Sequence, residues 1–240
     1  MEPVLTLALP RMIMPEYLTR GAPIVVLAPH PDDESLGCGA LLTHAFAQRG
    51  AHVICMTDGS ASHPGSTEWP PARLANARRF ELERAVACLG GTPSDITWLG
   101  HPDGWLGAQD RKAVAAGTAQ ICRDLGARHL FAPAVQDHHE DHRSTARIAH
   151  IVATTVLGLV QFAYPVWSRH DDPDLLARVS HLGPVALDTC NARSAKRAAI
   201  AAHATQLGLI VRDDPAGFAL SAAFVDAFVD GPEFYWKVPS

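Results

Sequence analysis

One stretch, residues 24–34, constrains the fold of this chain more than any other. Residues 24–28 are all apolar and include two adjacent valines, which is typical of a buried strand in a parallel sheet. The prolines at positions 29 and 31 cannot donate hydrogen bonds to a neighbouring strand, so the strand is expected to end there. His30 and three carboxylates at 32–34 follow at once. The sequence therefore predicts a buried strand whose carboxyl end carries an imidazole and three acids.

A helix is expected directly after this loop. Either Asp33 or Ser35 can cap a helix that starts near Leu36 and runs to Gln48, and Gly50 follows as its stop. In open α/β sheets, ligands bind at the carboxyl ends of the strands. The strand–loop–helix unit therefore places its polar loop where such proteins keep their chemistry.

The rest of the chain alternates between short apolar strands and longer helices, which is typical of βαβ units. This alternation predicts a Rossmann-like α/β fold, with a mostly parallel sheet and helices on both faces. Further strands are expected at 52–57, 96–99, 129–132, 159–166 and 185–188, and further helices at 72–89, 110–125, from 142 to about 157, 191–207 and 220–229.

No internal repeat or low-complexity linker divides the chain, so its 240 residues are expected to form a single domain. Residues 1–22 contain several prolines and are predicted to be an irregular segment that wraps one edge of the fold. Residues 208–240 are predicted to be a C-terminal extension, and 60–71 a loop rich in serine and proline.

Composition and charge narrow the classes of function. A 48% apolar fraction supports a full core, and a net charge of −5 does not provide the basic face that nucleic acid requires. No apolar run is long enough to span a membrane, and the first residues are a poor secretory signal. The five cysteines are scattered and odd in number, which favours buried thiols in a reducing compartment. We therefore expect a cytoplasmic protein.

The loop at 29–34 is suited to binding a metal ion. A catalytic zinc usually takes three protein ligands from imidazole and carboxylate, and keeps one position for water. His30 and Asp33 are three residues apart on a tight loop, so both can reach one metal. Asp32 lies between them and is left free to act on a bound water.

A third ligand is expected from the loop after the strand at 129–132. Histidines stand there at 138, 139 and 142, and the flanking acids Asp137 and Asp141 are able to hold an imidazole in one tautomer. A polar surface loop with helix-capping acids would explain residues 137–142 equally well. The residues alone leave both interpretations open.

Other catalytic motifs are missing from the sequence. His139 and His142 do not have the H-E-x-x-H spacing, and the deaminase pattern, the P-loop and the G-x-S-x-G elbow do not occur. Gly37-Cys38-Gly39 lacks the third glycine of a dinucleotide-binding loop. These two glycines are better explained by close packing of the first helix on the sheet.

Two motifs carry a family resemblance. Ala28-Pro29-His30-Pro31-Asp32-Asp33-Glu34 resembles the A-H-P-D-D-E motif of the LmbE-like, or PIG-L, zinc-dependent N-deacetylases, with Pro29 as an extra residue. His139-Glu140-Asp141-His142 resembles the family's H-P-D-H, with Glu140 in place of proline. Weaker matches stand in the family's order at 57–59, Arg78 with Glu81, 102–104, 164–167 and 196–206. The resemblance covers roughly residues 24–207.

The resemblance implies a role for each matching residue. One zinc ion per chain, or another divalent metal, would be bound by His30, Asp33 and His142. Asp32 would be the general base. His139, oriented by Asp141, would be the general acid and the oxyanion partner, and Arg78 and Asp103 would face the sugar.

Two of the weaker matches also have simpler interpretations. Arg78 and Glu81 are spaced to form an ion pair on the surface of a helix, worth a few tenths of a kcal/mol. Residues 164–167 are more typical of core and strand end than of a substrate wall. His101 and His203 are expected to be structural or loop residues.

The resemblance implies hydrolysis of an N-acetyl group on an N-acetylglucosamine-type amino sugar or glycoconjugate by zinc-activated water. The alternatives are a related amidase acting on a sugar–thiol or other N-acyl conjugate, a catalytically silent sugar-binding module, and a purely structural Rossmann-like protein. The sequence identifies neither the sugar nor the aglycone, and it leaves a homo-oligomer open. We expect the 60–71 loop and the C-terminal segment to set the substrate.

Overall fold

The strand at 24–28 lies inside an eight-stranded sheet. The computed structural model describes residues 10–239, and its strands follow the order β1-β7-β8-β6-β5-β2-β3-β4. β2 (Ile24–Ala28) pairs in parallel with β3 (Ala51–Thr57) on one side and with β5 (His129–Pro133) on the other. The sheet is completed by β4 (Ile96–His101), β6 (Val160–Tyr164), β7 (Val185–Leu187), β1 (Arg11–Ile13) and β8 (Glu233–Lys237), which runs antiparallel to both its neighbours.

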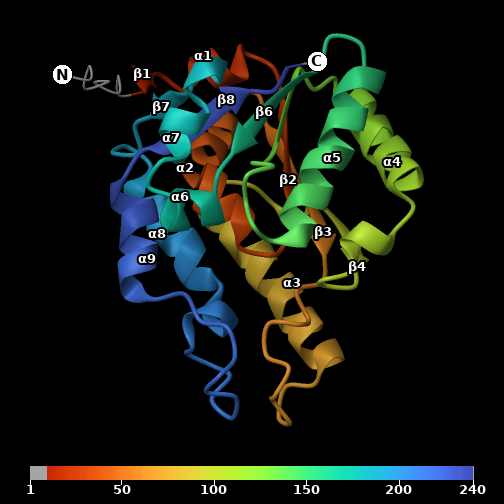
Figure 1. Ribbon diagram of the computed structural model, residues 1–240, viewed down its shortest axis with the longest axis vertical. Helices are drawn as coiled ribbons and strands as arrows, with labels where there is room; N and C mark the ends of the chain where they lie inside the picture. Colours follow the sequence, from red (N-terminus) through yellow and green to blue (C-terminus); the bar gives the residue numbers. More distant parts are fainter. Residues whose placement is uncertain (1–9, 240) are drawn as a thin grey trace, which may run out of the picture.

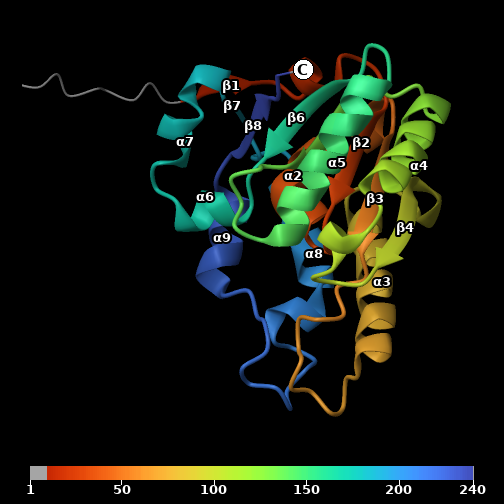
Figure 2. The same ribbon diagram turned by 45° about the vertical axis from the view of Figure 1, so that its right-hand side comes forward.

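Helices cover both faces of this sheet (Figures 1 and 2). One face carries α2 (Asp33–Gln48), α3 (Pro71–Cys88), α8 (Arg193–Ala202) and α9 (Ala222–Asp230), and the other carries α4 (Arg111–Asp124) and α5 (Glu140–Thr155). Short helices follow individual strands: α1 (Glu16–Thr19), α6 (Trp167–Asp171) and α7 (Leu175–Arg178). The prediction of an α/β fold with a mostly parallel sheet is confirmed.

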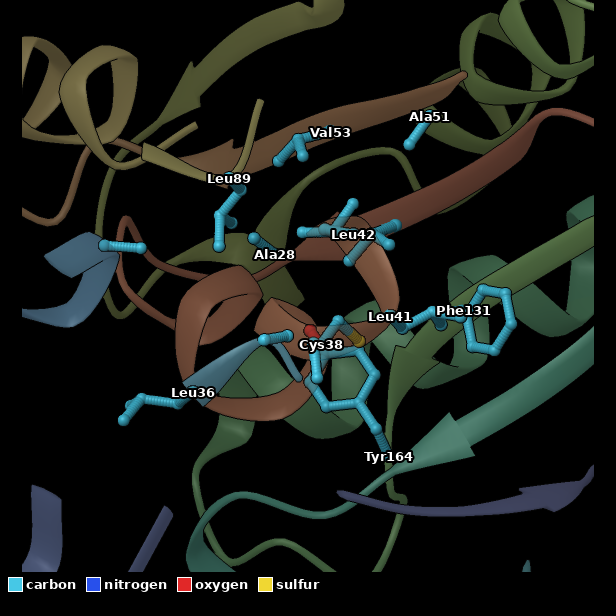
Figure 3. Close-up of a cluster of buried hydrophobic side chains, with 14 of the residues drawn as sticks. Ala28, Leu36, Cys38, Leu41, Leu42, Ala51, Val53, Leu89, Phe131 and Tyr164 are labelled. Carbon is cyan, nitrogen blue, oxygen red and sulfur yellow. The ribbon is translucent and has the colours of Figure 1, made fainter. Parts of the chain in front are cut away.

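The two faces have separate cores because side chains alternate along each strand. In β2, residues 24, 26 and 28 belong to the core under α2, whereas residues 25 and 27 belong to the core under α5. Figure 3 shows Leu41 and Leu42 among the buried side chains of the α2 core. Burying one such leucine contributes about 1.5–3 kcal/mol, which makes α2 a rigid support for the loop before it.

The C-terminal segment is not an appendage. Part of the predicted extension, Glu233–Lys237, forms β8, which lies between β7 and β6 within the sheet. Its three aromatic residues gave no period that marks a strand, and an antiparallel strand is not expected from alternating βαβ units. The helix predicted near 220–229 is present as α9.

Three local predictions were wrong. The described part of the predicted irregular segment, residues 10–22, contains β1 and α1, and residues 1–9 lie outside the described range. Helix α2 begins at Asp33 and receives no side-chain cap from that residue or Ser35. Helix α8 begins two residues after Asn191, its N-cap position is Ala192, and a 3₁₀ turn replaces its expected end at 204–207.

Two global expectations can be compared with the structure. Among residues 10–239, no helix combines the length and apolar character needed to cross a bilayer. All five cysteines are free, as expected, but Cys88 and Cys190 are exposed rather than buried.

The strand order places two loops side by side. From β2 the chain moves outward through β3 and β4, whereas β5 lies on the other side of β2 and leads outward to β6. The loops after β2 and β5 therefore diverge at a topological switch point, where α/β proteins form their binding crevice. The first of these loops contains His30, and the second contains residues 134–139.

Candidate metal centre and active site

The two loops bring His30, Asp33 and His142 together. Asp33 begins helix α2, and His142 lies in the first turn of α5. Oδ2 of Asp33 lies 3.3 Å from Nδ1 of His30 and 3.2 Å from Nε2 of His142. All three side chains are buried. These are the residues for which the resemblance implies metal binding, although the first and last of them, His30 and His142, are 112 positions apart in the sequence.

One nitrogen of this group lacks a hydrogen-bond partner. Nε2 of His142 is fully buried and makes no hydrogen bond of acceptable geometry with any residue in the described range. Its other nitrogen, Nδ1, lies 2.9 Å from Oδ2 of Asp137, which fixes the ring and its tautomer. An unpartnered imidazole nitrogen facing a buried carboxylate fits a divalent cation, which prefers this donor set.

Further acids surround His30 on its other side. Nε2 of His30 lies 3.1 Å from Oδ1 of Asp103 and 3.4 Å from Oδ2 of Asp141. Within the described residues, two sets of potential metal donors have all their atoms within 4.8 Å of one another, namely His30 with His139 and His142, and His30 with Asp103 and Asp141; Asp33 belongs to neither set. Asp103, predicted to face the sugar, thus lines the cleft but also contacts a proposed metal ligand.

The pKa shifts of His30, Asp33 and His142 show that the carboxylates around the two imidazoles favour positive charge there. Burial lowers the pKa of both imidazoles, but the surrounding carboxylates outweigh it, raising the pKa of His30 well above its ordinary value and that of His142 to about 9. Burial raises the pKa of Asp33, but the adjacent imidazoles outweigh burial and hold that pKa below its ordinary value. In the absence of a metal, protons on the imidazoles balance the carboxylates.

Asp32 occupies a strained position at the edge of the group. Its φ of 150° and ψ of −27° are unusual for a residue with a side chain. The backbone N–H of Asp32 donates to Oε2 of the buried Glu34 at 3.0 Å, and its Oδ2 accepts from Nη2 of Arg78 at 3.2 Å. Burial raises the pKa of Asp32 to about 6, despite the opposing charge of Arg78. A carboxylate with this pKa is suited to accept a proton near neutral pH.

Arg78 lines the cleft, but its guanidinium is already engaged by the protein. Its guanidinium is buried and donates to the carbonyl oxygens of Gly59 and Pro31, as well as to Asp32. Gly59 has a φ of +64°, and a Cβ there would lie 2.5 Å from Nη1 of Arg78. Although Arg78 lines the cleft, these bonds commit it to holding Asp32 rather than to facing a sugar.

Arg78 and Glu81 do not form the surface ion pair that their spacing would allow. Both oxygens of Glu81 accept hydrogen bonds from Thr205 instead, at 2.8 and 2.6 Å. This tie fixes the turn after α8 against α3.

We expected Asp141 to orient His139, but the carboxylate of Asp141 is bonded to other groups. Its two oxygens accept the N–H groups of Gly104 and Leu106, at 2.7 and 3.0 Å. Only its backbone N–H reaches Nδ1 of His139, at 3.2 Å. That bond makes Nδ1 an acceptor and leaves the ring proton of neutral His139 on Nε2. Burial, together with the charges of His30 and His142, lowers the pKa of His139 to about 4.

Two neighbouring residues lie away from the site. Glu140, which replaces the family's proline, is exposed and pairs with Arg143 and Arg147 on the surface of α5. His138 is also exposed and lies 3.3 Å from Asp171. Of the histidines at 138, 139 and 142, His138 is therefore the one that the fold excludes from the centre.

A cleft of about 270 Å³ opens above these groups. Asp32, Asp33, His30, His139 and Asp103 form its polar part. The remainder is contributed mainly by Leu36, Ala61, Ser62, Trp167, Gln206, Phe218 and Leu220. The 60–71 loop and the C-terminal segment therefore both reach the cleft.

Sequence reasoning missed several of these residues. His203 lies 3.0 Å from Oε1 of Glu34 and so supports the residue that holds Asp32, but a single histidine after a helix gives no signal of that. Trp167 was expected in the core but lines the cleft, while Tyr164 is buried as predicted. Phe218 and Leu220 lie in a segment whose pattern is uninformative.

Comparison with known proteins adds to this geometry. Residues 25–153 match the PIG-L family, described as GlcNAc-PI de-N-acetylase. A 2′-N-acetylparomamine deacetylase of Streptomyces fradiae is 33% identical over 150 aligned positions, and the match covers 55% of this chain and 52% of that protein. The chain thus spans only about half the length of this relative.

Two further similarities extend over most of the chain. A 1D-myo-inositol 2-acetamido-2-deoxy-alpha-D-glucopyranoside deacetylase of Mycolicibacterium vanbaalenii is 29% identical over 255 aligned positions, covering 86% of this chain and 87% of the relative. The crystal structure of an N,N′-diacetylchitobiose deacetylase from Pyrococcus horikoshii has a TM-score of 0.67 at 21% identity, covering 90% of this chain and 84% of that one. At this identity the structural match shows the fold.

Proposed function

This chain belongs to the PIG-L family of de-N-acetylases, and from that membership we propose that it hydrolyses the N-acetyl group of an N-acetylglucosamine-type sugar. The products would be acetate and a free amine. The two relatives named above act on an acetylated paromamine and on an inositol acetamidoglucopyranoside, which supports an amino-sugar glycoside as the substrate class. We place the reaction in the cytoplasm, because the chain's cysteines are all free.

One observation carries this proposal. The Asp33 carboxylate lies between two imidazoles, one of which has an unpartnered nitrogen, and Asp32 with its raised pKa stands beside them in the same cleft. We propose His30, Asp33 and His142 as the ligands of one divalent ion, and zinc as that ion. When bound, the ion would polarise the substrate carbonyl and acidify the attacking water.

The chain's own residues then perform the proton transfers. Asp32 takes a proton from the attacking water, and Arg78 keeps its carboxylate in place. Neutral His139 lines the cleft and donates from Nε2 to the carbonyl oxygen as negative charge develops there. Its lowered pKa, about 4, keeps His139 neutral near pH 7. Protonated Asp32 then gives its proton to the departing amine. Such a group typically contributes about 10²–10⁴ in rate.

Acetate release tests this proposal. The substrates are methyl N-acetylglucosaminide and the inositol glycoside of the relative, with and without a chelator. We expect acetate only without the chelator. Asp32→Asn is expected to keep its metal but lose at least about 10²-fold in kcat, whereas His30→Ala loses both metal and turnover. Asp174→Asn, an exposed carboxylate on the surface, is the matched control and should retain full activity.

Three results would contradict the proposal. Full activity in the chelated protein, or in Asp32→Asn, would rule out the assigned chemistry. Metal binding without acetate release would instead indicate a silent sugar-binding module. Release of a carboxylic acid from other N-acyl conjugates, but not from N-acetylated amino sugars, would indicate the related amidase named above as an alternative.

A further inference from the structure

Two loops that are far apart in sequence are bound together beside the cleft. Residues 60–70 and 208–220 extend past the end of α3 and lie next to each other in both ribbon views, coloured orange and blue (Figures 1 and 2). Asp213 accepts hydrogen bonds from Ser66 Oγ at 2.7 Å and from the N–H groups of Thr67 and Glu68 at 2.8 and 2.9 Å. Asp214 accepts from the N–H of Gly65 at 2.8 Å. The loops therefore act as one unit.

This unit holds apolar side chains against the cleft. The N–H of Phe218 donates to the carbonyl oxygen of Ser62 at 2.8 Å, and that of Leu220 to the carbonyl oxygen of Gln206 at 2.7 Å. The ring of Phe218 meets Trp167 edge to face, with centroids 5.6 Å apart. Together with Leu36, the residues Trp167, Phe218 and Leu220 form what we call the apolar wall.

The position of Trp167 is fixed by the metal centre itself. Its N–H and that of Val166 donate to Oδ2 of Asp137, at 3.3 and 3.1 Å. The same oxygen holds Nδ1 of His142. The apolar wall is therefore built rigidly onto the polar part of the cleft, which makes it suitable for recognition.

The chemistry of the wall differs from that of the polar part. Beside it, the cleft offers the polar side chains of Ser62 and Gln206, and these are already hydrogen bonded to each other at 3.2 Å. The ionisable residues lining the cleft belong to its polar part and to Arg78, which is committed to Asp32. The wall itself offers one polar side-chain atom, the buried Nε1 of Trp167, which has no hydrogen-bond partner among the described residues. The rest of its surface is carbon, so a polyhydroxylated group placed there would lose water and gain few hydrogen bonds.

A single acetyl methyl is too small to cover two aromatic rings and two leucines. We propose that the apolar wall is an aglycone subsite, and that the preferred substrates are N-acetylglucosamine glycosides with an apolar aryl or alkyl aglycone. This inference rests on the proposed function. The reacting acetamide occupies the polar part at the strand ends, so the loops beyond the strand ends meet the far side of the substrate.

A pair of simple glycosides tests the inference with the full metal-loaded chain. Phenyl and methyl N-acetylglucosaminides of both anomers are compared by acetate release and by calorimetric binding. For one anomer we expect the phenyl glycoside to have a KM and a Kd roughly tenfold lower than the methyl glycoside, with kcat unchanged, because burial of the ring on the wall stabilises the complex.

Variants of the wall locate the effect. Phe218→Ala should bring the phenyl and methyl glycosides within a factor of about two, and Phe218→Leu, which stays apolar, should keep most of the preference. Phe80→Ala removes an equally large ring from an exposed position on α3 outside the cleft, and this variant should keep the whole preference for the phenyl glycoside.

The outcomes separate this inference from the proposed function. Equal KM values for the two glycosides in the wild-type chain would overturn the aglycone subsite whatever the variants do. A preference for N-hexanoyl over N-acetyl groups with no aglycone preference would overturn it too. Tighter binding of the phenyl glycoside without acetate release would support the subsite and overturn deacetylation.

Discussion

Two buried ionic clusters lie against helix α2, and they differ in how fully the chain's own hydrogen bonds satisfy them. Near its middle, the lysine cluster consists of Lys196, Glu233 and Tyr235, all buried. At its first turn, the metal cluster consists of His30, Asp33 and His142. The comparison shows two ways in which a fold can retain buried carboxylates.

The lysine cluster is satisfied by the chain itself. Oε1 of Glu233 accepts from Nζ of Lys196 at 2.6 Å and from the N–H of Ala40 at 2.7 Å. Oε2 accepts from Tyr235 at 2.8 Å and from the N–H of Leu41 at 3.1 Å. In the metal cluster, by contrast, Nε2 of His142 lies 3.2 Å from Oδ2 of Asp33 but makes no hydrogen bond of acceptable geometry with any described residue. The first cluster is satisfied by the chain's own groups, whereas we propose that the second is completed by a divalent cation.

Breaking the lysine cluster should give the largest loss of stability. Lys196→Met leaves Glu233 as a buried charge without its counterion, which typically costs about 3–5 kcal/mol. Chemical denaturation measures this loss. Lys112→Met, at an exposed position, should change the free energy of unfolding by less than about 0.5 kcal/mol. A similar small change for Lys196→Met would contradict the view that this cluster is structural.

In the chelated protein, the metal cluster should make the free energy of unfolding depend on pH. Its His142 has a pKa raised to about 9 in the folded state, above an unfolded value of about 6.5. The stabilising proton is therefore fully present below about pH 6.5 and is lost as pH rises towards 9. We expect unfolding free energy to fall by about 3 kcal/mol across that window. His142→Ala should reduce this fall to the part that the raised pKa of His30 contributes, and Lys196→Met should keep it in full.

A smaller effect separates metal positioning from metal binding. Asp137→Asn weakens the partner that holds Nδ1 of His142 while leaving all three proposed ligands in place. We expect metal affinity to fall by about 10–100-fold, as is typical when such a partner is removed. Competition with a chromogenic chelator measures it. An unchanged affinity would show that packing alone orients the ring.

The sequence predicted the part of this molecule that follows local rules. The positions of β2 and α2 were marked by the apolar run at 24–28, by the prolines after it and by the helix boundaries near glycine. The βαβ alternation implied the fold. The grouping of His30 and Asp33 followed from spacing, and the family resemblance selected His142.

Long-range partners could not be predicted in the same way. Which donor meets a given carboxylate depends on packing between distant segments, so Arg78 was assigned to the sugar rather than to Asp32, and Asp141 to His139 rather than to the Gly104 and Leu106 backbone. The lysine cluster gave no signal, because Glu233 and Lys196 look like surface residues. The apolar wall was missed for other reasons, because Trp167 was expected in the core and the segment containing Phe218 and Leu220 has no informative pattern.

We propose that one divalent ion completes the metal cluster. Elemental analysis of the purified full chain, after loading with zinc and exhaustive dialysis, measures whether that ion is held. We expect one ion per chain in the wild type and in Lys196→Met, and less than about a tenth of that in His142→Ala. A wild-type chain that retains no metal, or a His142→Ala chain that retains a full equivalent, would contradict it.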